Sequence, residues 1–177
     1  MLIIIEGPDR TGKDTLIKNI NKYFDKTFLN VHSFGFGLPP EEEKVKARKV
    51  YFDTMRTFLG IYGAHIIWNR SYLGEYVYGK IIRNYDFNIE EFENDFKYTD
   101  LFRTAKLIVL VDDPKNLVKR EDGNSLSNGD LLTTKIQEVQ RFKEVFDKTQ
   151  ICDKILIDIR DKTTDDVFSA VKEFLIK

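Results

Sequence analysis

The feature that most constrains this chain is a glycine-rich segment that directly follows an apolar run. Residues 1–5 read Met-Leu-Ile-Ile-Ile, which is typical of a parallel strand buried on both faces. The segment 7–13 then fits the pattern G-x-x-x-x-G-K, and Leu16, Ile17 and Ile20 follow it at helical spacing. Strand, loop and helix thus occur in the order that a phosphate-binding loop requires, and the alternative is a chance match in a surface loop.

An anion the size of a triphosphate must be surrounded by hydrogen-bond donors, and such a loop supplies them from its backbone. Side chains at Gly7 and Gly12 would obstruct the tight turn or the ligand's approach. A helix beginning near residue 12 would direct its free amides at the same phosphates, and Lys13 adds a full charge. The loop residues predicted to bind the phosphates of a nucleotide are Gly7, Arg10, Thr11, Gly12, Lys13, Asp14 and Thr15.

One position in the loop departs from the usual pattern. Asp14 stands where a serine or threonine hydroxyl normally helps to hold Mg²⁺, and Thr15 comes one position too late to replace it simply. A carboxylate can hold Mg²⁺ directly or through water. Its negative charge beside a triphosphate should make the metal more necessary, so we predict that Asp14 is the metal-binding residue.

Composition narrows the remaining choices. With 177 residues and 42% hydrophobic content, the chain is expected to form a single domain over 1–177. Its net charge of −1 gives no global attraction to nucleic acid or to an anionic membrane. One cysteine and two histidines favour a hard metal ion held by oxygen over a Cys/His cluster. The apolar start is too short for a signal peptide or a membrane span, so the expected location is the cytoplasm.

Strand patterns alternate with helix patterns along the chain, which predicts a three-layer α/β/α fold of the P-loop NTPase type with a five-stranded parallel sheet. Strands are expected at 2–6, 28–33, 64–68, 106–111 and 153–158. Helices are expected at 13–25, 41–59, 72–83, 88–97, 114–121, 131–148 and 164–176.

A polar stretch at about 120–130 contains two glycines, two asparagines and two serines. Its composition favours a solvated connection. The alternative is a lid that closes over the phosphates.

Two groups of residues resemble the P-loop nucleoside and nucleotide kinases, and most closely thymidylate kinase. That family opens with an apolar strand, a glutamate and G-x-D-R-x-G-K, which this chain matches at Glu6, Gly7, Asp9, Arg10, Gly12 and Lys13. In the family, an Asp-Arg or Glu-Arg pair ends the third strand and precedes a helix with aromatic residues. The corresponding residues here are Asn69, Arg70, Ser71, Tyr72, Tyr76 and Tyr78. The Gly-Lys-Asp sequence also resembles some phage deoxynucleotide kinases.

The resemblance implies ATP- and Mg²⁺-dependent phosphoryl transfer to a deoxynucleoside monophosphate, with dTMP as the leading acceptor. Such a reaction needs positive charge around the moving group. By resemblance, Arg10 stabilises the transferred phosphoryl group and Asp9 meets the acceptor's sugar hydroxyl. The predicted catalytic residues are Arg10, Lys13, Arg70 and Glu6. The predicted acceptor contacts are Asp9, Phe36, Phe52, Arg56, Arg70 and Tyr76, and Arg120 and Arg160 are further predicted ATP contacts.

Two departures and several alternatives stay open. Asn69 replaces the acid of the pair, and residues 34–37, Phe-Gly-Phe-Gly, replace the family's Phe-Pro-x-Arg. Glu6 is either a general base for an acceptor hydroxyl or a partner for an arginine. The alternative functions are a deoxynucleoside kinase and a nucleotide-binding regulator without kinase activity. The expected partner is a small nucleotide rather than a nucleic acid or a membrane, and a homodimer is compatible with the sequence.

Overall fold

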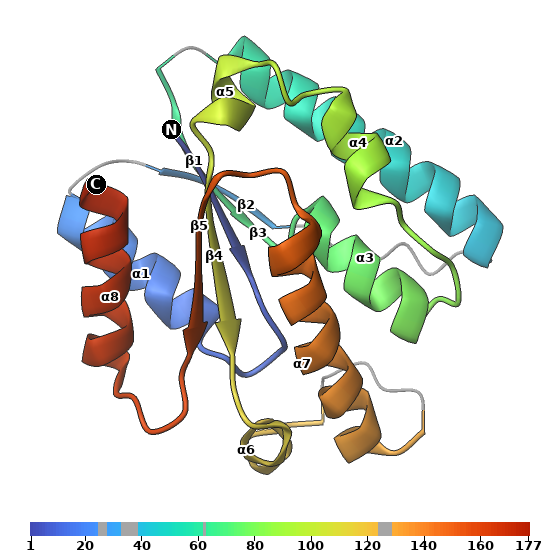
Figure 1. The fold of residues 1–177 in the computed structure, drawn as a ribbon, viewed down its shortest axis with the longest axis vertical. Coiled ribbons are helices and arrows are strands. Elements are labelled where there is room, and N and C mark those ends of the chain that lie inside the picture. Colours follow the sequence, from blue (N-terminus) through green and yellow to red (C-terminus); the bar gives the residue numbers. More distant parts are fainter. Residues whose placement is uncertain (25–27, 33–38, 62, 124–128) are drawn as a thin grey trace.

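An all-parallel sheet of five strands forms the centre of the molecule (Figure 1). The computed structural model describes residues 1–24, 28–32, 39–61, 63–123 and 129–177. The strand order is β2-β3-β1-β4-β5, so the first strand of the chain lies in the middle of the sheet. Each strand lies within a residue of its expected position. The strands are β1 (Leu2–Glu6), β2 (Phe28–His32), β3 (His65–Asn69), β4 (Lys106–Val111) and β5 (Asp153–Asp158).

Helices cover both faces of this sheet, which confirms the predicted three-layer α/β/α fold (Figure 1). One face carries α1 (Lys13–Phe24) and α8 (Thr164–Ile176), which pack against each other. The other face carries α2 (Pro40–Gly60), α3 (Tyr72–Ile81), α4 (Ile89–Asn94), α5 (Asp100–Arg103) and α7 (Leu131–Lys148), and α6 (Pro114–Lys119) follows the end of β4. The short helix α5 is the element that the sequence did not predict. No helix in the described ranges is long and apolar enough to cross a membrane.

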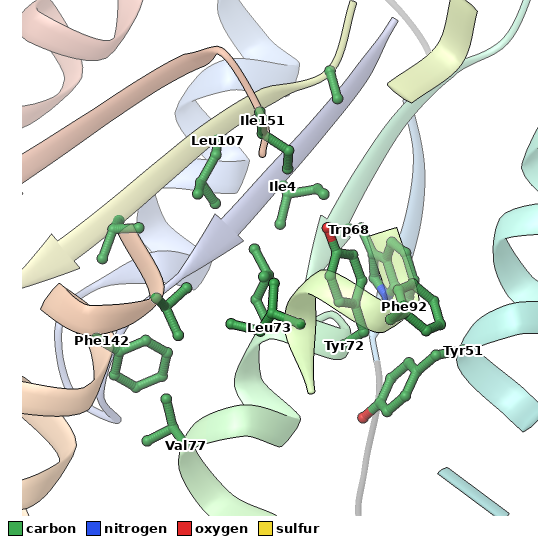
Figure 2. Close-up of a cluster of buried hydrophobic side chains, with 14 of the residues drawn as sticks. Ile4, Tyr51, Trp68, Tyr72, Leu73, Val77, Phe92, Leu107, Phe142 and Ile151 are labelled. Carbon is green, nitrogen blue, oxygen red and sulfur yellow. The ribbon is translucent and has the colours of Figure 1, made fainter. Parts of the chain in front are cut away.

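The central strand is buried on both faces, and its alternate residues belong to two separate cores. Leu2 and Ile4 face the larger core, whereas Ile3 and Ile5 face the core beneath α1 and α8. The larger core is rich in aromatic rings, with Trp68 at its centre (Figure 2). The apolar run at the start of the chain is therefore what allows helices to pack on both sides.

The strand register places three loops beside one another at the carboxyl edge of the sheet. Ile5 pairs with Asn69 of β3, and Glu6 pairs with Val109 of β4. The loop that follows β1 therefore lies between the ends of β3 and β4. In open parallel sheets this edge is where ligands bind.

A first prediction concerns how strongly the larger core depends on α7. Phe142 of α7 is 1% exposed, whereas Ile136 of the same helix is 49% exposed. We expect Phe142→Ala to lower the free energy of unfolding by about 3–5 kcal/mol, because it leaves a cavity. The matched control Ile136→Ala should cost under about 1 kcal/mol. Chemical denaturation measures both, and equal losses would contradict this packing.

Candidate functional site

The loop after β1 has the backbone conformation that its glycines allow. Gly7 has φ 142° and Gly12 has φ 81°. A Cβ atom at Gly7 would lie 2.2 Å from the carbonyl oxygen of Leu110, so only glycine fits against β4. The first helical hydrogen bond of α1 runs from the Leu16 amide to the Gly12 carbonyl at 3.0 Å. The free amides of α1 therefore begin where the loop ends, as anion binding requires.

Lys13 lies inside this loop. Its ammonium group is buried and donates to the carbonyl oxygens of Gly7 at 2.6 Å and Pro8 at 2.7 Å. Burial lowers the pKa of Lys13 to about 8, and the carboxylate of Asp9 opposes that shift. Two of its three N–H donors are thus used to hold the loop in shape, and the third is available to a phosphate.

Residues 120–122 contact the loop through the side chains of Arg120 and Asp122. Arg120 donates to the backbone oxygen of Arg10 at 3.2 Å and to Asp112 at 2.5 Å. Arg10, which has φ 71°, forms an ion pair with Asp122. The start of the polar stretch is therefore in contact with the loop, whereas residues 124–128 lie outside the described residues. Whether this stretch closes as a lid stays a prediction.

The sequence did not single out Asp112 as a residue of this site. It is buried directly after β4 and accepts hydrogen bonds from Asn116 and Arg120. Its position after a buried strand was the available signal, because polar residues at the carboxyl ends of parallel strands gather at one edge.

A cavity of about 310 Å³ opens beside the loop. Its walls come from the loop and first turn of α1, from Arg120, and from the connection between β5 and α8. The lining includes Arg10, Thr11, Gly12, Thr15, Arg120, Lys162 and Thr163. Five residues predicted to bind ATP thus share one cavity.

Four residues predicted to bind ATP do not line this cavity, namely Gly7, Lys13, Asp14 and Arg160. Arg160 lies after β5. Its exposed guanidinium group bonds to Asp158 at 2.5 Å. Lys162 and Thr163 of the same connection line the cavity instead. The predicted contact of Arg160 with ATP stays a prediction.

Glu6 holds the neighbouring βα turn in place. One carboxylate oxygen accepts from the Ser71 amide at 2.6 Å and from the Ser71 hydroxyl at 2.8 Å, while Ser71 caps α3. The side chain is 1% exposed, and burial raises its pKa to about 7, against the lowering effects of Ser71 and Lys13. Its described hydrogen bonds go to Ser71 rather than to an arginine, which favours a structural role.

Asp9 and Arg70 form the opposite side of the loop. Arg70 follows β3 with φ 59°, and its guanidinium group pairs with the carboxylate of Asp9. Both side chains are partly exposed, at 37% for Arg70 and 18% for Asp9. The structure thus joins one predicted catalytic residue and one predicted acceptor contact across the carboxyl edge of the sheet.

Asp14 and Asn69 are in direct contact. The side-chain amide of Asn69 donates to Asp14 at 3.1 Å and lies 3.1 Å from His32 Nδ1. Asn69 is 3% exposed, and its Oδ1 has no hydrogen-bond partner among the described residues. Carboxylate and amide oxygens are ligands that Mg²⁺ accepts, so this pair fits the ion that the fold implies.

The remaining predicted acceptor contacts are Phe36, Phe52, Arg56 and Tyr76. Phe36 lies outside the described residues. Phe52 packs on Phe96 at 5.0 Å, and Arg56 lies over the Phe52 ring. Tyr76 donates to Glu144 of α7. These contacts belong to the packing of α2, α4 and α7, and the predicted roles in acceptor binding stay predictions.

Comparison with known proteins finds related structures but no related sequences. No protein-family model and no curated sequence matches the chain. The Bacillus subtilis protein YorR, solved with phosphorylated GDP, is 18% identical over 99% of this chain and 96% of its own, with a TM-score of 0.71. Candida albicans thymidylate kinase is 17% identical over 99% and 90%, with a TM-score of 0.69. Deoxyadenosine kinase from M. mycoides with bound dATP is 14% identical over 100% of both chains, with a TM-score of 0.65.

The chain shares the fold of thymidylate kinase and deoxyadenosine kinase. The resemblance drawn from the loop and from residues 69–71 is thereby confirmed for the fold. At identities of 14–18%, the likeness leaves the acceptor and the roles of individual side chains to be argued from the site itself.

A second prediction concerns the ion pair between Arg10 and Asp122. A bound phosphate would compete with Asp122 for Arg10, so we expect Asp122→Asn to tighten ATP binding. The gain should be roughly two- to fivefold, because the pair is partly exposed. Isothermal titration calorimetry measures it. Asp53→Asn removes the same charge from an exposed pair with Lys49 on α2 and should leave the affinity unchanged. Weaker binding by Asp122→Asn would contradict the competition.

A third prediction follows from the raised pKa of Glu6. The folded state keeps a proton on Glu6 that the unfolded state loses near pH 4.5, so wild-type stability falls as the pH rises toward 7. Glu6→Gln removes this dependence. Relative to wild type, its free energy of unfolding should rise by on the order of 1 kcal/mol or more between pH 5 and 7.5. Other titrating groups occur in both proteins and cancel. A constant difference across that range would show that Glu6 has an ordinary pKa.

Proposed function

We propose that this chain is an ATP- and Mg²⁺-dependent kinase that phosphorylates a deoxynucleoside monophosphate, with dTMP as the leading acceptor. The observation that carries the proposal is the position of Arg10. It lies within the phosphate-binding loop, lines the cavity, and is bridged to residues 120–122. A cation at this point can stabilise the negative charge on a phosphoryl group while that group passes from one phosphate to another, as phosphoryl transfer requires.

Each side of the loop has its own part in this proposal. The cavity beside Arg120 and Thr163 receives ATP, whose phosphates accept from the remaining donor of Lys13 and replace Asp122 as the partner of Arg10. The Asp9 and Arg70 side receives the acceptor. Asp14 and Asn69 would hold Mg²⁺, which supplies neutralisation of the charge on the phosphate oxygens when it is bound.

The state of Glu6 favours a monophosphate over a nucleoside as acceptor. A 5′-hydroxyl needs a general base to take its proton, whereas a phosphate acceptor is already anionic near neutral pH. Glu6 is 1% exposed and is bonded to the amide and the hydroxyl of Ser71, so it is poorly placed to reach an acceptor hydroxyl. The structural neighbours include both a monophosphate kinase and a nucleoside kinase, and they do not decide between the two.

The direct test is ATP-dependent turnover of a panel of acceptors. Coupled ADP release with each deoxynucleoside monophosphate should show activity, with dTMP among the substrates. Turnover of unphosphorylated deoxynucleosides alone would favour the nucleoside kinase. ATP binding without turnover of either class would favour a nucleotide-binding regulator.

A fourth prediction separates catalysis by Arg10 from ground-state binding. Arg10→Ala should lower kcat by roughly 10²-fold or more, with a much smaller change in ATP affinity, because Arg10 acts on the transition state. Arg103→Ala, on the exposed surface of α5, should leave both values unchanged. An equal loss in kcat and in affinity would assign Arg10 to ATP binding alone.

A further inference from the structure

Two residues of the proposed metal site depart from the usual P-loop pattern together. P-loop enzymes commonly hold Mg²⁺ with a hydroxyl after the loop lysine and an acid at the end of a neighbouring strand. Here the acid, Asp14, follows the lysine, and the neutral side chain, Asn69, ends the strand. One formal negative charge is kept, but it has moved from the strand to the helix.

The fold holds these two positions against each other. Asn69 is the last residue of β3 and is paired in register with Ile5, directly before the loop. Asp14 is in the first turn of α1, directly after the loop. The 3.1 Å hydrogen bond from Asn69 Nδ2 to Asp14 Oδ1 therefore joins the end of β3 to the first turn of α1, beside the phosphate-binding turn.

We propose that Asp14 and Asn69 form a charge-swapped Mg²⁺ site, in which Asp14 supplies the charge and Asn69 is the positioning residue that orients it. This inference rests on the proposed ATP-dependent function. Asp14 is exposed, so without a donor its carboxylate would sample several rotamers. Asn69 is buried and fixed by its strand, so it restricts Asp14 to one arrangement beside the phosphates.

Asn69 Oδ1, which has no hydrogen-bond partner within the described part of the chain, is the second observation that points to a ligand. A buried amide oxygen without a hydrogen bond is costly, and native structures seldom leave one unsatisfied. A hard cation, or a water molecule bound to one, is a partner that suits an amide oxygen. Asp14 cannot satisfy Oδ1, because an ionised carboxylate only accepts.

The geometry also explains why the two positions should change together. An aspartate at position 69 beside Asp14 would set two carboxylates in contact, at a cost that a bound cation or protonation of one carboxylate must offset. A serine at position 14 beside Asn69 would leave the site without a formal charge. Each single reversion therefore spoils the pair, and the double reversion restores one charge and one neutral oxygen.

Mn²⁺ binding followed by electron paramagnetic resonance, with a non-hydrolysable ATP analogue present, tests this without requiring turnover. Asp14→Ser should weaken Mn²⁺ binding by about tenfold or more, the size typical of lost metal-site groups. The double variant Asp14→Ser with Asn69→Asp should recover to within about threefold of wild type. A double variant that binds Mn²⁺ no better than Asp14→Ser alone would overturn the swap.

Asn69→Ala tests the positioning role in two backgrounds. In the wild-type background it should weaken Mn²⁺ binding by about tenfold, because Asp14 loses its orienting donor. In the Asp14→Ser background the loss should be clearly smaller, since no carboxylate remains to be oriented and only the contact of the amide oxygen with the ion or its water is removed. Equal losses in both backgrounds would show that Asn69 does not orient Asp14 and would overturn this part of the proposal.

The same experiment separates the failure of this inference from the failure of the proposed function. If wild type binds the ATP analogue but substitutions of Asp14 and Asn69 leave the Mn²⁺ affinity unchanged, only the charge swap is wrong. If wild type binds no ATP analogue with or without the metal, the proposed function is wrong and the swap is overturned with it. Thermal unfolding of each variant checks that it is folded, and the exposed Asp14→Ser arm keeps the test available if Asn69→Ala unfolds.

Discussion

The hydrogen bonds between Glu6 and Ser71 join the two turns on which the rest of the site depends. Glu6 ends the central strand and begins the phosphate-binding loop, while Ser71 caps α3 after the neighbouring strand. Burying a carboxylate costs free energy unless hydrogen-bond donors surround it. The raised pKa of Glu6 reflects the part of this cost that its donors do not offset. The hydrogen bonds between Glu6 and Ser71 also hold Asn69 and Arg70, the two residues before Ser71, at a set position beside the loop.

Each of the three arginines of the site pairs with an acid in this structure. Arg10 pairs with Asp122, Arg70 with Asp9, and Arg120 with Asp112. Unpaired, three arginines beside Lys13 would repel one another. Arg10 and Arg70 are partly exposed, so water screens these pairs and a triphosphate can replace the acid at modest cost. The acid of Arg120 is fully buried, which suits a residue that fixes the loop in place rather than releasing it.

The sequence predicted most of the fold because its signals are local. The buried run at residues 1–5 and the glycines of the loop specify a strand and a turn without reference to distant residues, and the alternating patterns specify the parallel sheet. Most of the site residues that the sequence identified lie in the loop itself, whereas Arg70 and Arg120 lie outside it and contact it in the structure. Asp112 and Asp122 were missed because their roles depend on contacts with Arg120 and Arg10, which are distant in sequence or in another element. The sequences of β1 and β4 also do not specify that these two strands are neighbours in the sheet. The sequence alone does not separate an aromatic ring beside a site from one in a core, so the acceptor contacts predicted for Phe52 and Tyr76 stay predictions.

The register of β1 and β3 accounts for the behaviour of the two unusual positions. Pairing of Ile5 with Asn69 is a property of the backbone, so the side chain at position 69 meets the first turn of α1 whatever residue stands there. The same backbone constraint makes the two side chains a single electrostatic unit, since neither can change charge without affecting the other across 3.1 Å. Asp14, read alone, is an anomaly in a phosphate-binding loop. Together, Asp14 and Asn69 carry the same formal charge as the usual pair of a hydroxyl and an acid. This total charge is what a bound divalent cation and a triphosphate interact with.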